Sequence, residues 1–171
     1  LGDHCLWRKS VPFEGSARIP LLLNAPARFG LTRGQVLRQP VCLEDVMPTL
    51  LDMAGVPVPD GVEGESLLPL LRGETASLKR NHVHISMGRH VHSLTDGTEK
   101  YIHWMETGRE QLFNLDNDPT ECDDLVVSGK TGDRIPYWRG RLLEVLDAHR
   151  DVYGEEIEKI RLQDFHYPAQ N

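Results

Sequence analysis

Four side chains in the first twenty residues could take part in chemistry. His4 carries an imidazole, which could bond a substrate when neutral and donate a proton to a leaving group when protonated. Lys9 supplies a positive charge, although most lysines are exposed surface residues. Glu14 and Arg18 stand four residues apart, and we expect a structural ion pair that fixes this turn, because a charge buried there needs a partner.

Histidines gather in the middle of the chain, with two pairs at alternating positions. The pairs are His82/His84 and His90/His92, and His103 follows. Alternate residues of a strand point to one face, so adjacent strands could bring these rings within metal-ligand distance. The Cys or carboxylate that accompanies such ligands at fixed spacing is absent. We therefore favour polar strand faces, or contacts with another part of a longer protein, over a metal site.

The composition excludes several classes of partner. The 171 residues contain 19 Lys+Arg and 26 Asp+Glu, a formal net charge of −7 without a basic run, so neither nucleic acid nor an anionic membrane surface is expected to bind. No apolar run approaches the roughly 20 residues of a membrane span. The cysteines, Cys5, Cys42 and Cys122, lack paired spacing, and we expect free thiols. The compartment stays open.

The first elements that must position these residues are a strand and a helix. Residues Ile19–Leu23 form a continuous apolar run, which predicts a strand buried on both faces of a sheet and unable to stand alone. From Leu43 to Ala54 apolar residues recur at helical spacing, with Asp45 as the expected N-cap and Gly55 as the stop. This helix should lay its apolar stripe on the sheet that the strand joins.

The remainder of the chain alternates between strands and turns before a second helix. A Pro/Gly-rich connection and a short helical turn at 66–73 are followed by an antiparallel meander. Its strands are His82–Met87, His90–Leu94, Glu99–Trp104 and Gln111–Leu115. An amphipathic helix from Pro136 should pack on the meander, and the charged tail after Tyr153 is expected to be a poor core former.

Several segments resemble the sulfatase family of the alkaline-phosphatase-like superfamily. Residues 2–20, here called the N-terminal motif, match the family's G-D/E-H, L-W-x-K and F/Y-E-G-S-x-R-V/I-P, which close an active-site signature. Residues 95–102 match T-D-G-x-x-K-Y-I, and residues 110–121 match E-Q-L-F-N-L-x-N-D-P-x-E. The resemblance covers nearly the whole chain and weakens only over the last ~20 residues, where no period is readable.

The resemblance implies an α/β protein with an α+β arrangement in this chain. Residues 1–80 would form the C-terminal end of the alkaline-phosphatase-like sulfatase core, with the N-terminal motif, a buried strand and a packing helix. Residues 81–171 would form a small C-terminal antiparallel four-stranded sheet packed with a helix, followed by a tail. We therefore expect the chain to be the C-terminal portion of a longer protein.

The resemblance also implies which catalytic groups this chain supplies. The lysine of L-W-x-K reaches a sulfate oxygen in sulfatases, which implies a catalytic and substrate-binding role for Lys9, and His4 matches a histidine beside the pocket. The sulfatase nucleophile is a formylglycine made from the cysteine of C-x-P-S/A-x-R, a pattern that none of the three cysteines begins. A divalent cation, Ca²⁺ by resemblance, would be held by ligands upstream of this chain, so Asp3 is not an expected ligand.

These implications define the expected function and its alternatives. We expect a sulfuric ester hydrolase that acts on small-molecule sulfate monoesters, with this chain inactive unless joined to its N-terminal catalytic portion. One alternative is a phosphonate-monoester or phosphodiester hydrolase of the same superfamily. Another is a noncatalytic binding or oligomerisation module, because a second copy of the chain could also cover the strand and helix of residues 19–55.

Overall fold

The computed structural model describes residues 3–6 and 11–162, which form two compact units. The first unit joins the N-terminal residues, up to Ile19, to the residues from His84 onward. The second unit comprises Pro20–Val83. The first is built around a sheet, and the second around a buried carboxylate.

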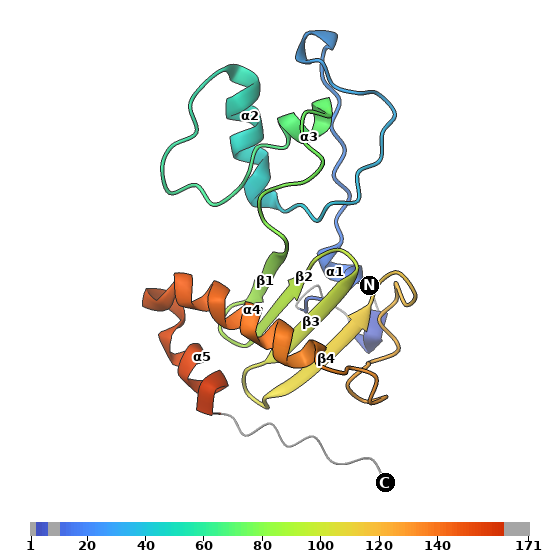
Figure 1. Cartoon of the computed structure of the whole chain (residues 1–171), viewed down its shortest axis with the longest axis vertical. Coiled ribbons are helices and arrows are strands. Elements are labelled where there is room, and N and C mark those ends of the chain that lie inside the picture. Colours follow the sequence, from blue (N-terminus) through green and yellow to red (C-terminus); the bar gives the residue numbers. More distant parts are fainter. Residues whose placement is uncertain (1–2, 7–10, 163–171) are drawn as a thin grey trace. The chain divides into compact units, whose positions relative to one another are not determined.

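The sheet contains the predicted meander. Its strands are β1 (Val83–Met87), β2 (Val91–Thr95), β3 (Glu99–Trp104) and β4 (Arg109–Asn114), in the order β1-β2-β3-β4 (Figure 1). The β2/β3 and β3/β4 pairs are antiparallel, and their turns contain Gly97 and Gly108 at φ 91° and 66°. A positive φ at these turns costs glycine little, which explains why both hairpins were readable from the sequence.

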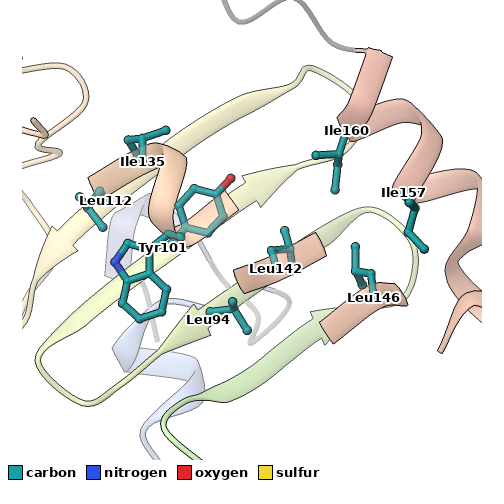
Figure 2. Close-up of a cluster of buried hydrophobic side chains, with 9 residues drawn as sticks. Leu94, Tyr101, Leu112, Ile135, Leu142, Leu146, Ile157 and Ile160 are labelled. Atoms are coloured by element: carbon teal, nitrogen blue, oxygen red, sulfur yellow. The ribbon is translucent and has the colours of Figure 1, made fainter. Parts of the chain in front are cut away.

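Two helices cover one face of this sheet. Helix α4 (Arg134–Ala148) lies across the strands with α5 (Arg150–Leu162) beside it (Figure 1). Figure 2 shows their side chains meeting those of the strands in one apolar core. Its buried residues are Leu94, Tyr101, Leu112, Ile135, Trp138, Leu142, Leu146, Ile157 and Ile160. The prediction that a helix from Pro136 packs on the meander is confirmed.

The prediction for the residues after Tyr153 was wrong as far as residue 162. These residues belong to α5, which buries Ile157 and Ile160 in the same core. The two isoleucines lie three positions apart and therefore share one helix face, whereas the surrounding charged residues concealed this short stripe.

The other face of the sheet is covered by the N-terminal segment. Phe13 packs with Val91, Ile102 and Phe113, and the short helix α1 (Glu14–Ala17) follows it directly. We predicted that residues 1–80 form one domain, whereas in the structure the described residues up to Ile19 belong to the same compact unit as the sheet. The assignment of residues 1–80 to the end of a catalytic core stays a prediction.

The second unit is organised by the buried carboxylate of Asp45. This carboxylate accepts hydrogen bonds from the backbone N–H groups of Cys42 (2.8 Å) and Glu65 (2.9 Å) and from both terminal nitrogens of Arg80. Asp45 is the N-cap residue of helix α2 (Val46–Ala54), as predicted, but its side chain makes no cap hydrogen bond to that helix. Helix α3 (Leu68–Arg72) confirms the predicted helical turn, and Gly55 ends α2 as expected.

Several apolar side chains of the second unit lie on its surface, although Leu67, Leu68 and Leu70 are buried. Residues Ile19–Leu23 form no strand in this structure, and Leu22 is 90% exposed. On α2, Thr49 is buried while Met47 and Leu50 are exposed. The predicted strand and stripe therefore find no sheet among the described residues of this unit. None of the helices within residues 3–6 and 11–162 is long and apolar enough to cross a membrane.

We predict that the isolated chain associates as its concentration rises, because water-exposed apolar groups gain free energy when they are covered. Light scattering should show the apparent mass rising with concentration, and Leu22→Ser with Leu50→Ser should reduce the rise. Leu162→Ser, which changes an exposed leucine at the end of α5, is the control and should leave it unchanged. A compact monomer at all concentrations would contradict this prediction.

Candidate functional site

The two residues predicted to act in catalysis differ in what the structure says of them. Lys9 lies outside the described residues, so its predicted role stays a prediction. His4 is described, in a 3-10 turn at Asp3–Cys5. The site is therefore built from His4 and from the residues that follow the undescribed stretch, beginning at Val11.

His4 is held from two sides. Its ring stacks on Phe13, with centroids 4.0 Å apart and an interplanar angle of 11°. Its Nε2 lies 3.1 Å from the carbonyl oxygen of Thr120. A carbonyl can only accept a hydrogen bond, so Nε2 carries the proton and donates it. The neutral ring then offers Nδ1 as its acceptor, and only the imidazolium can donate through Nδ1.

Phe13 joins this segment to the sheet. Its ring meets Phe113 of β4 edge to face, with centroids 5.9 Å apart, and both rings are buried. Such an arrangement places the positive edge of one ring against the negative face of the other. The aromatic contacts among His4, Phe13 and Phe113 thus connect His4 and Phe13 to β4.

Glu14 is bound to a buried lysine. The Nζ atom of Lys100 on β3 lies 2.6 Å from Glu14 Oε1 and 2.9 Å from Glu121 Oε1, and the Lys100 side chain has no exposed surface. The expected pair with Arg18 is present, but at 3.7 Å and with the Arg18 side chain 74% exposed. Because exposed pairs contribute little, Lys100 is the partner that fixes Glu14.

Glu121 completes this ion cluster. Its Oε2 accepts the backbone N–H of Glu14 at 2.5 Å, and its side chain is fully buried. Burial raises the pKa of Glu121, and the attraction of Lys100 only partly offsets this effect. The two carboxylates and one ammonium, here called the Lys100 cluster, therefore hold the start of α1 against the sheet.

Sequence reasoning missed Lys100 and Glu121 as residues of the site. Both occupy fixed positions of the two matched segments, Lys100 in T-D-G-x-x-K-Y-I and Glu121 at the end of N-D-P-x-E. The match to these motifs could have pointed to the two residues. It could not show that they contact Glu14, because Lys100 and Glu121 are 86 and 107 residues away from Glu14 in the chain.

Three of the histidines, His84, His92 and His103, are neighbours, since His92 and His103 are partners across β2 and β3. His84 Nε2 lies 3.1 Å from His92 Nδ1, and the two rings stack with centroids 5.3 Å apart. His103 lies 3.9 Å from Glu110, whereas His90 bonds Glu106 at an exposed hairpin. In the described part of the chain no group of three or more His, Cys, Asp or Glu side chains could hold a metal ion.

A second buried ion pair stabilises the helix face of the sheet. Arg139 of α4 donates to both carboxylate oxygens of Glu110, at 2.8 and 2.6 Å, and the hydroxyl of Tyr101 donates to Oε1 at 2.5 Å. Burial opposes ionisation of Glu110, but these bonds together hold its pKa below the usual value. This network connects α4 to β4 and lies on the face opposite the Lys100 cluster.

Comparisons with known proteins agree on one family. A family model described as N-sulphoglucosamine sulphohydrolase, C-terminal, matches residues 2–145. An arylsulfatase of Clostridium perfringens is 36% identical over 162 residues, which cover 91% of this chain and 33% of that protein. A choline-sulfatase of Rhizobium meliloti is 34% identical over 131 residues, covering 74% of this chain and 25% of that protein.

One solved structure shares the fold at lower identity. A phosphonate monoester hydrolase from Silicibacter pomeroyi superposes with a TM-score of 0.54 at 23% identity, over 71% of this chain and 27% of that one. At this identity the likeness concerns the fold alone. The chain spans a third or less of the length of these relatives.

Glu14→Ala should act through stability. It leaves the buried Lys100 with one carboxylate, so we expect the free energy of unfolding to fall by about 2 to 3 kcal/mol in urea denaturation. Arg18→Ala removes only the exposed partner and should cost less than about 0.5 kcal/mol. Equal losses in the two variants would contradict the assignment of Lys100 as the main partner.

His92 should make the fold sensitive to acid. Burial, with repulsion from His84 and His103, lowers the pKa of His92 from 6.5 to about 4. At pH values between these two pKa values, His92 is protonated in the unfolded chain and neutral in the folded chain. Stability is therefore retained above pH 6.5 and falls by up to about 3 kcal/mol as the pH drops to 4.

Urea denaturation between pH 4 and 8 measures this effect. His92→Asn removes the titrating group and should flatten the dependence of unfolding free energy on pH within that window. His90→Asn, at the exposed hairpin, is the matched control and should keep the slope that His92 contributes. An unchanged slope in His92→Asn would show that His92 is not the responsible group.

Proposed function

The chain belongs to the sulfatase family, and from this we propose that it is the C-terminal portion of an enzyme that hydrolyses sulfate monoesters. The observation that carries the proposal is the family match over residues 2–145, which includes the whole N-terminal motif. Two residues of that motif, His4 and Glu14, are held by the turn that follows β4, and a binding surface needs such fixed residues.

In the proposed enzyme, Lys9 contacts a sulfate oxygen. Hydrolysis of the ester moves negative charge onto the transferred group and the leaving oxygen, and an ammonium aimed at that charge stabilises the transition state more than the bound substrate. His4 lies beside the same group. Since its Nε2 is occupied by the Thr120 carbonyl, it would meet the substrate through Nδ1, accepting when neutral and donating when protonated.

The nucleophile and metal ion of the proposed reaction would come from elsewhere in the longer protein. A formylglycine would form from a cysteine outside this chain, because no cysteine here begins C-x-P-S/A-x-R. A divalent cation, Ca²⁺ by family resemblance, would polarise the sulfate oxygens when bound. The described residues offer no group of ligands for it. We therefore propose that this chain alone is inactive.

The N-terminal catalytic portion is the proposed partner of the second unit. The exposed apolar residues at Leu21–Leu23 and on α2 would lie on a sheet supplied by that portion. A second copy of the chain is the competing occupant. The acidic net charge of −7 gives no reason to propose nucleic acid or a membrane surface as a partner.

A phosphonate-monoester or phosphodiester hydrolase is the alternative substrate class. This chain shares its fold with a phosphonate monoester hydrolase, which is why we name this alternative. Proteins with one fold can catalyse different reactions, so the fold does not decide between them. We favour sulfate because residues 6–15 match the sulfatase motif L-W-x-K-x-x-x-F-E-G at every fixed position. Comparing kcat/KM for an aryl sulfate and an aryl phosphonate on the longer protein decides between them.

Lys9→Ala in the longer protein should lower kcat/KM for an aryl sulfate by roughly two to three powers of ten, equivalent to about 3 to 4 kcal/mol of lost transition-state stabilisation. The melting temperature should hardly change. Lys9→Arg should restore activity only in part, since a planar guanidinium does not replace a compact ammonium.

Two controls accompany this measurement. Lys130→Ala removes an exposed lysine and should leave kcat/KM unchanged, and the 171-residue chain alone should show no turnover. The proposed function fails if Lys9→Ala stays within a few-fold of the unaltered enzyme, or if the isolated chain hydrolyses the ester.

A further inference from the structure

One short turn holds both described ends of the catalytic part of the N-terminal motif. The carbonyl oxygen of Thr120 accepts from His4 Nε2 at 3.1 Å, and the side chain of the next residue, Glu121, accepts from the backbone N–H of Glu14 at 2.5 Å. Two adjacent residues thus bind positions ten apart in the sequence. Lys9 is in the sequence between these two anchored positions.

The anchored ends also touch each other. His4 stacks on Phe13 with ring centroids 4.0 Å apart, so these two residues, nine positions apart in the sequence, are in contact. His4, Phe13 and Glu14 are therefore held by three independent contacts, two of which involve the same turn.

The turn itself is fixed by Asp118. Its carboxylate accepts from the Thr120 hydroxyl at 3.2 Å and from the Asp123 N–H at 2.8 Å. Glu121 adopts φ 57°, a conformation that costs a non-glycine residue free energy and persists where the surroundings impose it. Here the imposed conformation accompanies a buried Glu121 carboxylate 2.9 Å from Lys100 Nζ.

We propose that the turn Asp118–Glu121 positions His4 for catalysis, with Glu121 as its main positioning residue. The proposal rests on the proposed function of the longer protein. Glu121 is fully buried and acts through other residues: through Glu14 directly, and through the Thr120 carbonyl on His4.

The Glu121 carboxylate accepts one hydrogen bond and pairs with one buried charge. Without its carboxylate the Glu14 N–H loses its acceptor, and Lys100 is left with Glu14 alone. Both losses loosen the same end of the anchored segment. A displacement of about 1 Å in a group that must meet a transition state can cost on the order of a hundredfold in rate.

Steady-state kinetics of the longer protein with an aryl sulfate test this proposal. Glu121→Ala should lower kcat/KM by about tenfold or more, with a larger change in kcat than in KM. Asp123→Ala removes an exposed carboxylate from the same loop, while its N–H still bonds Asp118, and should leave both constants unchanged. Glu121→Gln retains an oxygen acceptor and should recover part of the loss.

A double-mutant cycle separates positioning from general destabilisation. If Glu121 acts by positioning His4, Glu121→Ala should cost less than about twofold in kcat/KM once His4 is alanine, while lowering the melting temperature equally in both backgrounds. An equal fold-loss of kcat/KM in both backgrounds would overturn the proposal. If Glu121→Ala does not fold, the same cycle is run with Glu121→Gln and is judged by the same criterion.

A second readout is independent of activity. In the 171-residue chain, ¹⁵N chemical shifts of His4 should report a proton on Nε2, and Glu121→Ala should weaken this tautomer preference although Glu121 does not bond the ring. Unchanged shifts in Glu121→Ala would overturn the positioning role. If Lys9→Ala were harmless, the proposed function would fail, whereas the His4 shifts would still decide whether this turn positions the segment.

Discussion

A lysine ammonium that has no contact with water must be neutralised where it lies, and this requirement organises the sheet unit. Lys100 has no exposed side-chain surface, and its partners are Glu14 and Glu121. Leaving a buried charge unpaired costs several kcal/mol, so removing either Glu14 or Glu121 from Lys100 would destabilise the fold. The position of Glu14 is thus a consequence of the charge on β3, with the ring of Phe13 adding apolar contact.

In the second unit, helix α2 buries a polar side chain and exposes apolar ones. Asp45 and Thr49 are buried and bonded to backbone groups, whereas Met47 and Leu50 are exposed on the same helix. A helix normally turns its apolar stripe inward. The hydrogen bonds around Asp45 can therefore define the local conformation of this unit, while its apolar stripe is left to be covered by another surface.

Local patterns predicted the local structure well and the site only in part. Alternating residues and well-placed glycines gave the four strands and both hairpins, because these features depend on neighbours in sequence. The Lys100 cluster was not predictable in this way, since Glu14 and Glu121 approach Lys100 only after the chain has folded. Asp45 shows a related limit: it stands where an N-cap is expected, but a distant arginine, Arg80, takes its carboxylate.

The sequence separation of 107 residues between Glu14 and Glu121 has a consequence for the order of folding. The β2/β3 and β3/β4 hairpins close short loops and can form quickly, whereas seating Glu14 must close a long one. During synthesis the N-terminal motif leaves the ribosome first, and its anchoring turn follows after about 5 to 20 s at ordinary elongation rates. His4 and Glu14 therefore lack these partners until the turn that follows β4 has been translated.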